Sequence, residues 1–144
     1  MNLPSPHALV NPVDLAPAVG FAHAVTPVAG RAVHVAGQIA SGPDGAVVGS
    51  SLTEQFDVAL SNMISALAAA GARPEHLVSM LVFTTAMTDY RTSRREIGTV
   101  WRARLGRHFP AVALLGVTEL YEPSALVEIV AWAVVPDINA EEGT

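Results

Sequence analysis

The sequence contains no cysteine and no lysine, and these two absences exclude many kinds of chemistry. Without cysteine there is no thiol nucleophile, disulfide, iron–sulfur cluster or cysteine-based zinc site. Without lysine the chain cannot form a Schiff base with a substrate or with pyridoxal phosphate. All eight basic residues are arginines.

Positive charge and long apolar runs are also missing. The formal net charge is −5 at pH 7, so the basic surface typical of nucleic-acid-binding proteins is absent. No apolar run has the length of a membrane span, and the N-terminus lacks the pattern of a signal peptide. We therefore expect a cytoplasmic protein that binds neither nucleic acid nor a membrane.

The composition is that of one compact domain. Of the 144 residues 51% are hydrophobic and only 15% are charged, which predicts more than one buried face. Four prolines and little periodicity indicate an extended arm over residues 1–17. The domain is predicted over residues 18–136 and a short tail over residues 137–144.

Two helices are predicted from apolar spacing. Ser51 and Glu54 form a possible capping box before an apolar stripe, which predicts a helix from about residue 52 to 70. A second helix is predicted from Thr88 or Asp89 to about Leu105, before Gly106.

The predicted strands surround these helices. Residues 22–25 and 32–36 flank a turn and predict a β-hairpin. Residues 77–85, 111–117 and 125–135 are apolar at both odd and even positions, which is typical of strands covered on both faces. Because two helices cover only one face of a sheet, we expect another copy of the chain to cover the second face.

Glu128 is the one carboxylate in the apolar run of residues 125–135. An ionised carboxylate is costly to bury, so it is expected to be neutral or to have a cationic or hydrogen-bonding partner. Carboxylates in such places occur often at functional sites, whereas the structural alternative is an internal salt bridge or a subunit contact. Both alternatives stay open at this point.

Short segments in a fixed order carry a resemblance to a known family. They span about residues 18–136 and comprise His34-Val35-Ala36-Gly37-Gln38, Ala68-Ala69-Ala70-Gly71-Ala72, Val82-Phe83-Thr84-Thr85 leading into Asp89-Tyr90, Phe109-Pro110-Ala111, and Val127-Glu128-Ile129. In this order and spacing the chain resembles the Rid family, the YjgF-like reactive intermediate deaminases.

The resemblance implies an α+β fold and a chemistry. The fold would be chorismate-mutase-like, a mixed β-sheet with two helices packed on one face, and the protein a homotrimer with clefts between subunits. Active relatives hydrolyse imines and enamines to a ketone and ammonia without a metal or organic cofactor. The resemblance implies that Glu128 positions water and that Gly37 offers backbone groups to the substrate, although Gly37 could instead only allow close packing.

The sequence departs from the family pattern at several positions. Val112 stands where the family has an arginine that grips the substrate carboxylate. Phe21 replaces the usual tyrosine, and Arg94 stands where asparagine is frequent, so Arg94 is a candidate replacement anion anchor. Leu114 and Thr118 are further candidate cleft residues.

These departures favour a small-molecule substrate larger or more apolar than a simple 2-imino acid. The hypothesis is therefore hydrolysis of a reactive imine or enamine by water held on Glu128, with no cofactor and no metal. His23 and His34 alone make a poor metal site. The alternatives are a non-catalytic ligand-binding or interaction protein on the same trimeric scaffold, and RNA cleavage, which the acidic charge disfavours.

Overall fold

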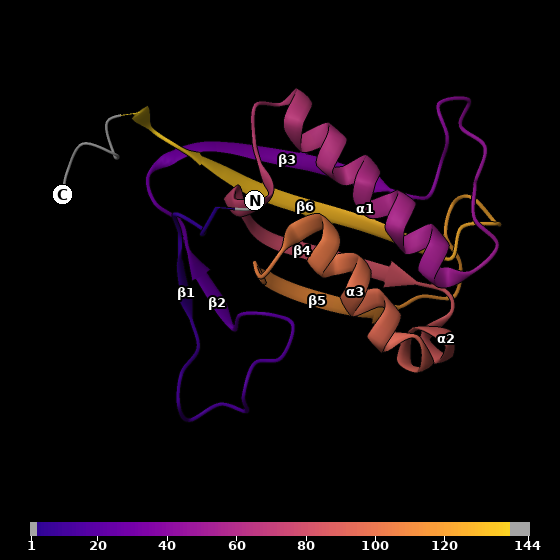
Figure 1. Cartoon of the computed structure of the whole chain (residues 1–144), viewed down its shortest axis with the longest axis horizontal. Coiled ribbons are helices and arrows are strands. Elements are labelled where there is room, and N and C mark those ends of the chain that lie inside the picture. The colour runs from indigo at the N-terminus through magenta and orange to yellow at the C-terminus, as the bar shows by residue number, and fades with distance from the viewer. Residues whose placement is uncertain (1–2, 139–144) are drawn as a thin grey trace.

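The domain consists of one four-stranded sheet with helices on a single face (Figure 1). The structure is a computed structural model and describes residues 3–138, so most of the predicted tail lies outside the described residues. The sheet has the order β3-β6-β4-β5, in which only β4 and β5 run parallel. Its strands are β3 (Gly30–Gln38), β4 (Leu77–Thr84), β5 (Ala111–Gly116) and β6 (Val127–Pro136). The α+β class and the mixed sheet are confirmed.

Helix α1 (Leu52–Ala69) matches its prediction closely. The Ser51 hydroxyl accepts a hydrogen bond from the Glu54 N–H, and the Glu54 carboxylate accepts from the N–H of Ser50 and Ser51. The stripe behind this cap is fully buried against the sheet and includes Phe56, Leu60, Met63 and Leu67. The cap and the spacing of the apolar residues both indicate the same helix, and this consistency explains why the predicted and observed helices agree.

The second predicted helix is two helices, α2 (Met87–Thr92) and α3 (Arg94–Leu105). Ser93 between them has φ −98° and ψ 14°, outside the helical region. The Thr92 hydroxyl donates to the Asp89 carbonyl, and such local side-chain bonds compete with a continuous helix. The sheet therefore carries three helices on one face where two were predicted.

The predicted first hairpin is wrong. Strand β2 (Ala24–Thr26) pairs with β1 (Ala8–Val10) in the N-terminal arm, and β3 pairs with β6. The long β3 buries Val33 and Val35 in the core, and this burial fixes its place beside β6. The short β1–β2 sheet lies beside one end of the main sheet (Figure 1).

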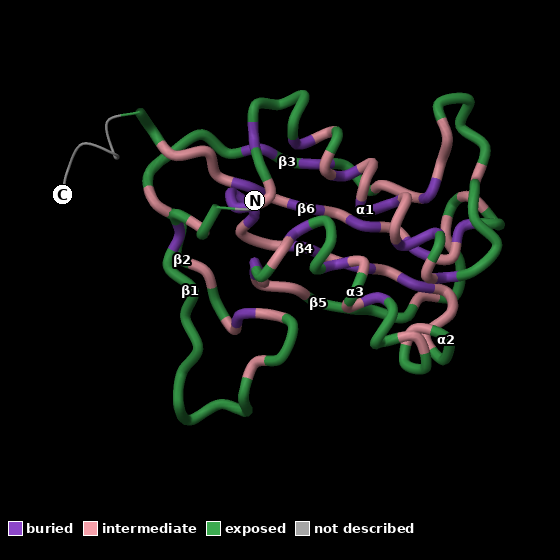
Figure 2. The backbone as a smooth tube through the Cα atoms, viewed as in Figure 1, coloured by how far each residue is buried: buried purple, intermediate pink, exposed green. Residues whose placement is uncertain are grey.

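Only one face of the main sheet is covered within the chain (Figure 2). Along β6, buried residues alternate with half-buried ones, so the single chain covers one face of the strand, and the cover of the other face by a second copy stays a prediction. The helix-covered face holds Val127, Ile129, Ala131 and Ala133, and the open face holds Glu128, Val130, Trp132 and Val134. His34 and Trp132 contact edge-to-face on the open face, where their register pairs them.

A buried amide connects α1 to the start of β6. The Gln55 side chain donates to the carbonyls of Gly49 and Ser124 and accepts from the N–H of Leu126. Gln55 is only 3% exposed, so these bonds are made away from bulk water. They fix the backbone two residues before Glu128.

We predict that Gln55→Ala lowers the free energy of unfolding by about 2–3 kcal/mol, because it leaves buried backbone groups unpaired. Urea unfolding measures the change. Ser61→Ala on the same helix is the control and should cost less than about 0.5 kcal/mol. Equal stability of the Gln55→Ala protein and the unmodified chain would show that the amide network is dispensable.

Candidate functional site

The Glu128 carboxylate lies against Gly37 of the neighbouring strand. The pairing of β3 with β6 shifts by one residue between Val35 and Gln38, which is a β-bulge. A Cβ placed on Gly37 would overlap the Glu128 carboxylate and its stem, so only glycine leaves room for this arrangement. The two residues that the sequence singled out separately thus form one contact.

Apolar side chains continue this site across the sheet. Glu128 pairs in register with Phe83 of β4, and Phe83 pairs with Leu115 of β5. Because registered partners lie on the same face, Phe83 and Leu115 share the open face with Glu128. Leu115 is 40% exposed, which is high for a large apolar residue in a strand.

Glu128 takes part in neither of the two ion pairs found among residues 3–138, which are Arg73–Glu75 and Arg104–Asp57. An internal salt bridge was one structural alternative for this carboxylate, and the described part of the chain offers none; the other alternative, a subunit contact, stays open. A half-buried carboxylate with apolar neighbours can hold a water molecule and accept a proton from it.

A pocket of about 260 Å³ lies at the start of β4 and β5, beside the arm. It brings together Phe21 and Val112, two of the predicted site residues. The Ala22 N–H donates to the Pro110 carbonyl at 3.0 Å, which fixes the segment between the arm and β2 at the start of β5, and the Phe21 and His23 rings contact edge-to-face. The complete lining is Phe21, Ala22, His23, Ser79, Met80, Leu81, Ala111, Val112 and Ala113.

This pocket and Glu128 are separated within one chain. Val112 pairs with the buried Met80, so its side chain lies on the helix-covered side with that of Leu114; it is three residues along β5 from Leu115, and β5 lies two strands from β6. Strand geometry makes the separation about 10 Å along the strands and about 10 Å across them, or about 14 Å in total. The side chains of one copy therefore do not converge on one ligand.

The remaining predicted residues lie elsewhere. Leu114 pairs with the buried Val82, so it is on the helix-covered side of the sheet and not on the face of Glu128. Arg94 is exposed at the first turn of α3, also on the helix side. Thr118 lines a second pocket, of about 410 Å³, beyond the ends of β4 and β5, with Thr85, Glu119, Leu120, Tyr121 and Pro123.

Phe83 and Leu115 are the candidate site residues that sequence reasoning missed. Leu114 was the predicted cleft residue of this strand, whereas the parallel register puts Leu115 beside Phe83 and hence on the face of Glu128. The register partner of Glu128 was the signal needed to find them.

Clear pKa shifts are found for groups next to the helices. Burial raises the pKa of the Tyr90 phenol, whose ring packs edge-to-face on Phe56 under the helices. Hydrogen bonds from the Ser50 backbone and hydroxyl lower the pKa of Glu54 at the start of α1. Among the described residues no cluster of His, Asp or Glu side chains suits a metal ion.

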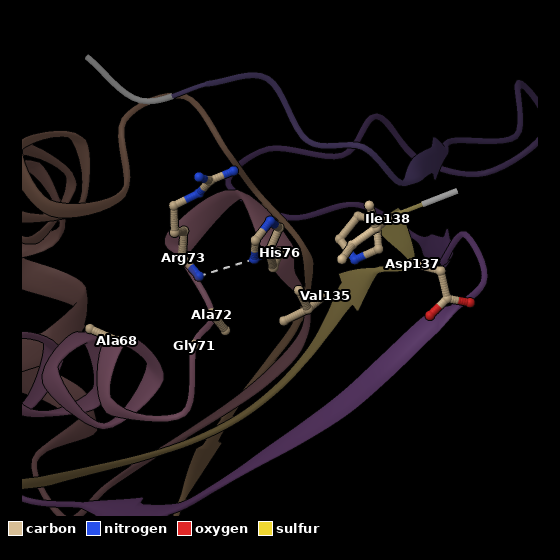
Figure 3. A pocket seen from close by; sticks show the side chains of 9 residues that line it. Ala68, Gly71, Ala72, Arg73, His76, Val135, Asp137 and Ile138 are labelled. Carbon is tan, nitrogen blue, oxygen red and sulfur yellow. Dashed lines mark hydrogen bonds between the residues drawn. The ribbon is translucent and has the colours of Figure 1, made fainter. Parts of the chain in front are cut away.

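A third pocket, of about 460 Å³, lies at the far end of β6 (Figure 3). Val135 and Pro136 form one wall, and the residues around Gly71 and His76 form the other. Seven residues of β6 separate Val135 from Glu128, which is about 23 Å. None of the predicted site residues lines this pocket.

Comparisons with known proteins agree with this geometry. The model of the Endoribonuclease L-PSP family matches residues 12–135. A Rid-family protein of unknown function, YyfB from Yersinia pestis, has 31% sequence identity and a TM-score of 0.81, over 90% of this chain and 98% of that one. No curated protein matches the chain.

Two further solved structures are similar. A member of the YjgF family from Mycobacterium tuberculosis has 32% identity and a TM-score of 0.61, over 81% of this chain and 88% of that one. Yeast Mmf1 has 26% identity and a TM-score of 0.63, over 92% and 97%. None of the helices in the described part of the chain has the length and apolar character needed to span a bilayer.

We predict that Gly37→Ala displaces the Glu128 carboxylate from β3 but changes the free energy of unfolding by less than about 1 kcal/mol, because the new methyl group overlaps only the end of a flexible side chain. A crystal structure and a urea titration measure the two effects. Gly98→Ala is the matched control, since a Cβ there meets only Arg102 Nη1, at 3.5 Å. An unmoved Glu128 in the Gly37→Ala protein would contradict the prediction.

Proposed function

Since the chain belongs to the Rid family, known for imine and enamine deamination, we propose that it hydrolyses a reactive imine or enamine and releases ammonia. The observation that carries the proposal is the Glu128 carboxylate, set against Gly37 on an apolar sheet face and without an ion-pair partner among residues 3–138. No cofactor is required, because the carbon of an imine is already electrophilic.

The proposed reaction needs water and one group that moves protons. Glu128 accepts a hydrogen bond from a water molecule and takes a proton as the water oxygen attacks the imine carbon. This step forms a carbon–oxygen bond, and Glu128 returns the proton to the nitrogen, which gives the neutral amino alcohol. Glu128 then takes the hydroxyl proton and passes it to the nitrogen as the carbon–nitrogen bond breaks and the carbon–oxygen double bond forms. The products, a ketone and ammonia, contain all the atoms of the imine and the water.

The substrate is proposed to be more apolar than a 2-imino acid. Val112 and Phe21 line the 260 Å³ pocket, and its only ionisable side chain is that of His23. A charged hydrogen bond to a substrate carboxylate is worth about 1.5–3 kcal/mol, and the side chain of Val112 cannot supply one. A substrate with a hydrocarbon or aromatic portion suits this lining better.

Two copies of the chain are needed to complete such a site. Within one copy, Glu128 lies about 14 Å from the Val112 pocket. A homotrimer that covers the open face would bring the Glu128 of one copy toward the pocket of another. The apolar residues exposed on that face, such as Leu115, support an intersubunit cleft.

Non-catalytic ligand binding is the alternative on the same scaffold. It shares the pocket and the oligomer but requires no proton transfer at Glu128. Ammonia release from candidate imines, measured with the protein and without it, separates the two functions.

We predict that Glu128→Gln lowers kcat by roughly 10²–10⁴ while the melting temperature and the oligomer stay unchanged, because the amide cannot accept the proton. A coupled ammonia assay and thermal unfolding measure these properties. Glu96→Gln, exposed on α3, is the control of equal charge change. Full turnover together with a much lower melting temperature would make Glu128 a structural residue.

We predict that 2-iminopropanoate is a poor substrate and that Val112→Arg raises its kcat/KM roughly ten- to a hundredfold by supplying the carboxylate contact. Val112→Gln is the control, because it adds a polar side chain of related length without a charge. A folded Val112→Arg protein with no gain would show that the pocket does not hold the substrate carboxylate.

A further inference from the structure

His23 brings a polar ring into the otherwise apolar 260 Å³ pocket. The residue is half-buried and lines the pocket beside Phe21. Apart from His23 and Ser79, every side chain in the lining is apolar. Pockets of this composition hold a ligand by apolar contact and use a few polar groups to orient and select it.

Contacts to the backbone and to the ring hold His23 in place. Its N–H donates to Asn11 Oδ1 at 2.9 Å, and its ring Nε2 lies 2.7 Å from the Ala16 carbonyl oxygen. The ring also contacts Phe21 edge-to-face, with 5.1 Å between the ring centroids. The ring is thus oriented before a ligand arrives, so little side-chain freedom is lost when a ligand binds.

The contact with Ala16 decides which ring nitrogen carries the proton. A carbonyl oxygen only accepts, so Nε2 donates to it, and Nδ1 of the neutral ring is then an acceptor. Among residues 3–138 no group donates a hydrogen bond to this Nδ1. Ala16 does not line the pocket, and the two ring nitrogens point in different directions. The nitrogen left for a ligand is therefore Nδ1.

The two polar side chains of the lining differ in what they select. The Ser79 hydroxyl can donate or accept, so it tolerates ligand groups of either kind. The Nδ1 atom of neutral His23 only accepts, so it favours a ligand with an O–H or N–H group. A ligand without such a group leaves Nδ1 unpaired and cut off from water, and this loss makes the ligand bind more weakly.

We propose that His23 selects the substrate by accepting a hydrogen bond at Nδ1 from an O–H or N–H group. The substrate class is then an imine or enamine whose hydrocarbon or aromatic portion carries a hydroxyl or N–H group. As a statement about substrate, this inference rests on the proposed function. As a binding preference of the pocket, it requires neither a charge on His23 nor a proton transfer at Glu128.

Phenol and anisole test the preference, because both contain one aromatic ring and one oxygen but only phenol can donate. Their Kd values come from NMR titrations at about pH 8, the upper end of the range in which imidazoles titrate. The ratio of the anisole Kd to the phenol Kd should be roughly three- to tenfold larger for the unmodified chain than for the His23→Phe protein, the effect of one hydrogen bond. Equal ratios would overturn the proposal. Tighter binding of benzoate than of phenol would also overturn it, because the pocket would then hold an anion.

His23→Asn is the matched variant. Both substitutions remove the hydrogen bond to Ala16, but asparagine keeps an acceptor oxygen near the position of Nδ1 and phenylalanine does not. Any loosening caused by the lost bond is therefore common to the two proteins. The His23→Asn protein should keep the preference for phenol that the His23→Phe protein loses. Loss of the preference in both proteins would contradict a role of the acceptor.

The ring nitrogens give a direct readout on the unmodified chain. Long-range ¹H–¹⁵N spectra should show a proton on Nε2 of His23 and none on Nδ1, and the Nδ1 signal should move with phenol but not with anisole. A proton on Nδ1 in the ligand-free protein would overturn the proposal. Since neither probe is hydrolysed, a protein that shows this preference but releases no ammonia from imines would contradict the proposed function and leave the preference intact.

Discussion

Three helices on one face of a four-stranded sheet leave the other face of that sheet open, and this constraint governs the rest of the molecule. The covered face takes the large apolar residues of α1 and α3 and gives the domain its core. The open face keeps Trp132, Phe83 and Leu115 half-buried or exposed. A domain of this size gains stability when such a face is covered, so the fold favours self-association.

The same face explains why Glu128 can be chemically useful. A carboxylate on the covered face would be surrounded by the core and would need a permanent cationic partner. On the open face it lies against Gly37 at a β-bulge, where the missing side chain makes room for it. The cost of placing a charge among apolar neighbours is then set by what covers the face, and the proposed subunit cleft would leave space for both water and substrate.

The sequence predicted the parts of the fold that depend on local signals. The capping box at Ser51 and the stripe behind it predicted α1, and the apolar runs predicted β4, β5 and β6. The prediction failed where pairing between distant segments decides the structure. Strand β2 pairs with β1 in the N-terminal arm, and β3 pairs with β6. The candidate site shows the same difference between local and distant signals. Glu128 and Gly37 were singled out from the sequence, whereas the sheet faces on which Leu114 and Leu115 lie could be assigned only from the strand register.

The central claim is that the open sheet face is an interface between copies of this chain and that the site lies there. Light scattering after size-exclusion chromatography tests this claim without knowledge of the substrate. The account predicts a mass three times the chain mass of 15.0 kDa at micromolar concentration. A stable species with the mass of one chain would contradict it, because Glu128 and the Val112 pocket would then remain on separate parts of a single sheet.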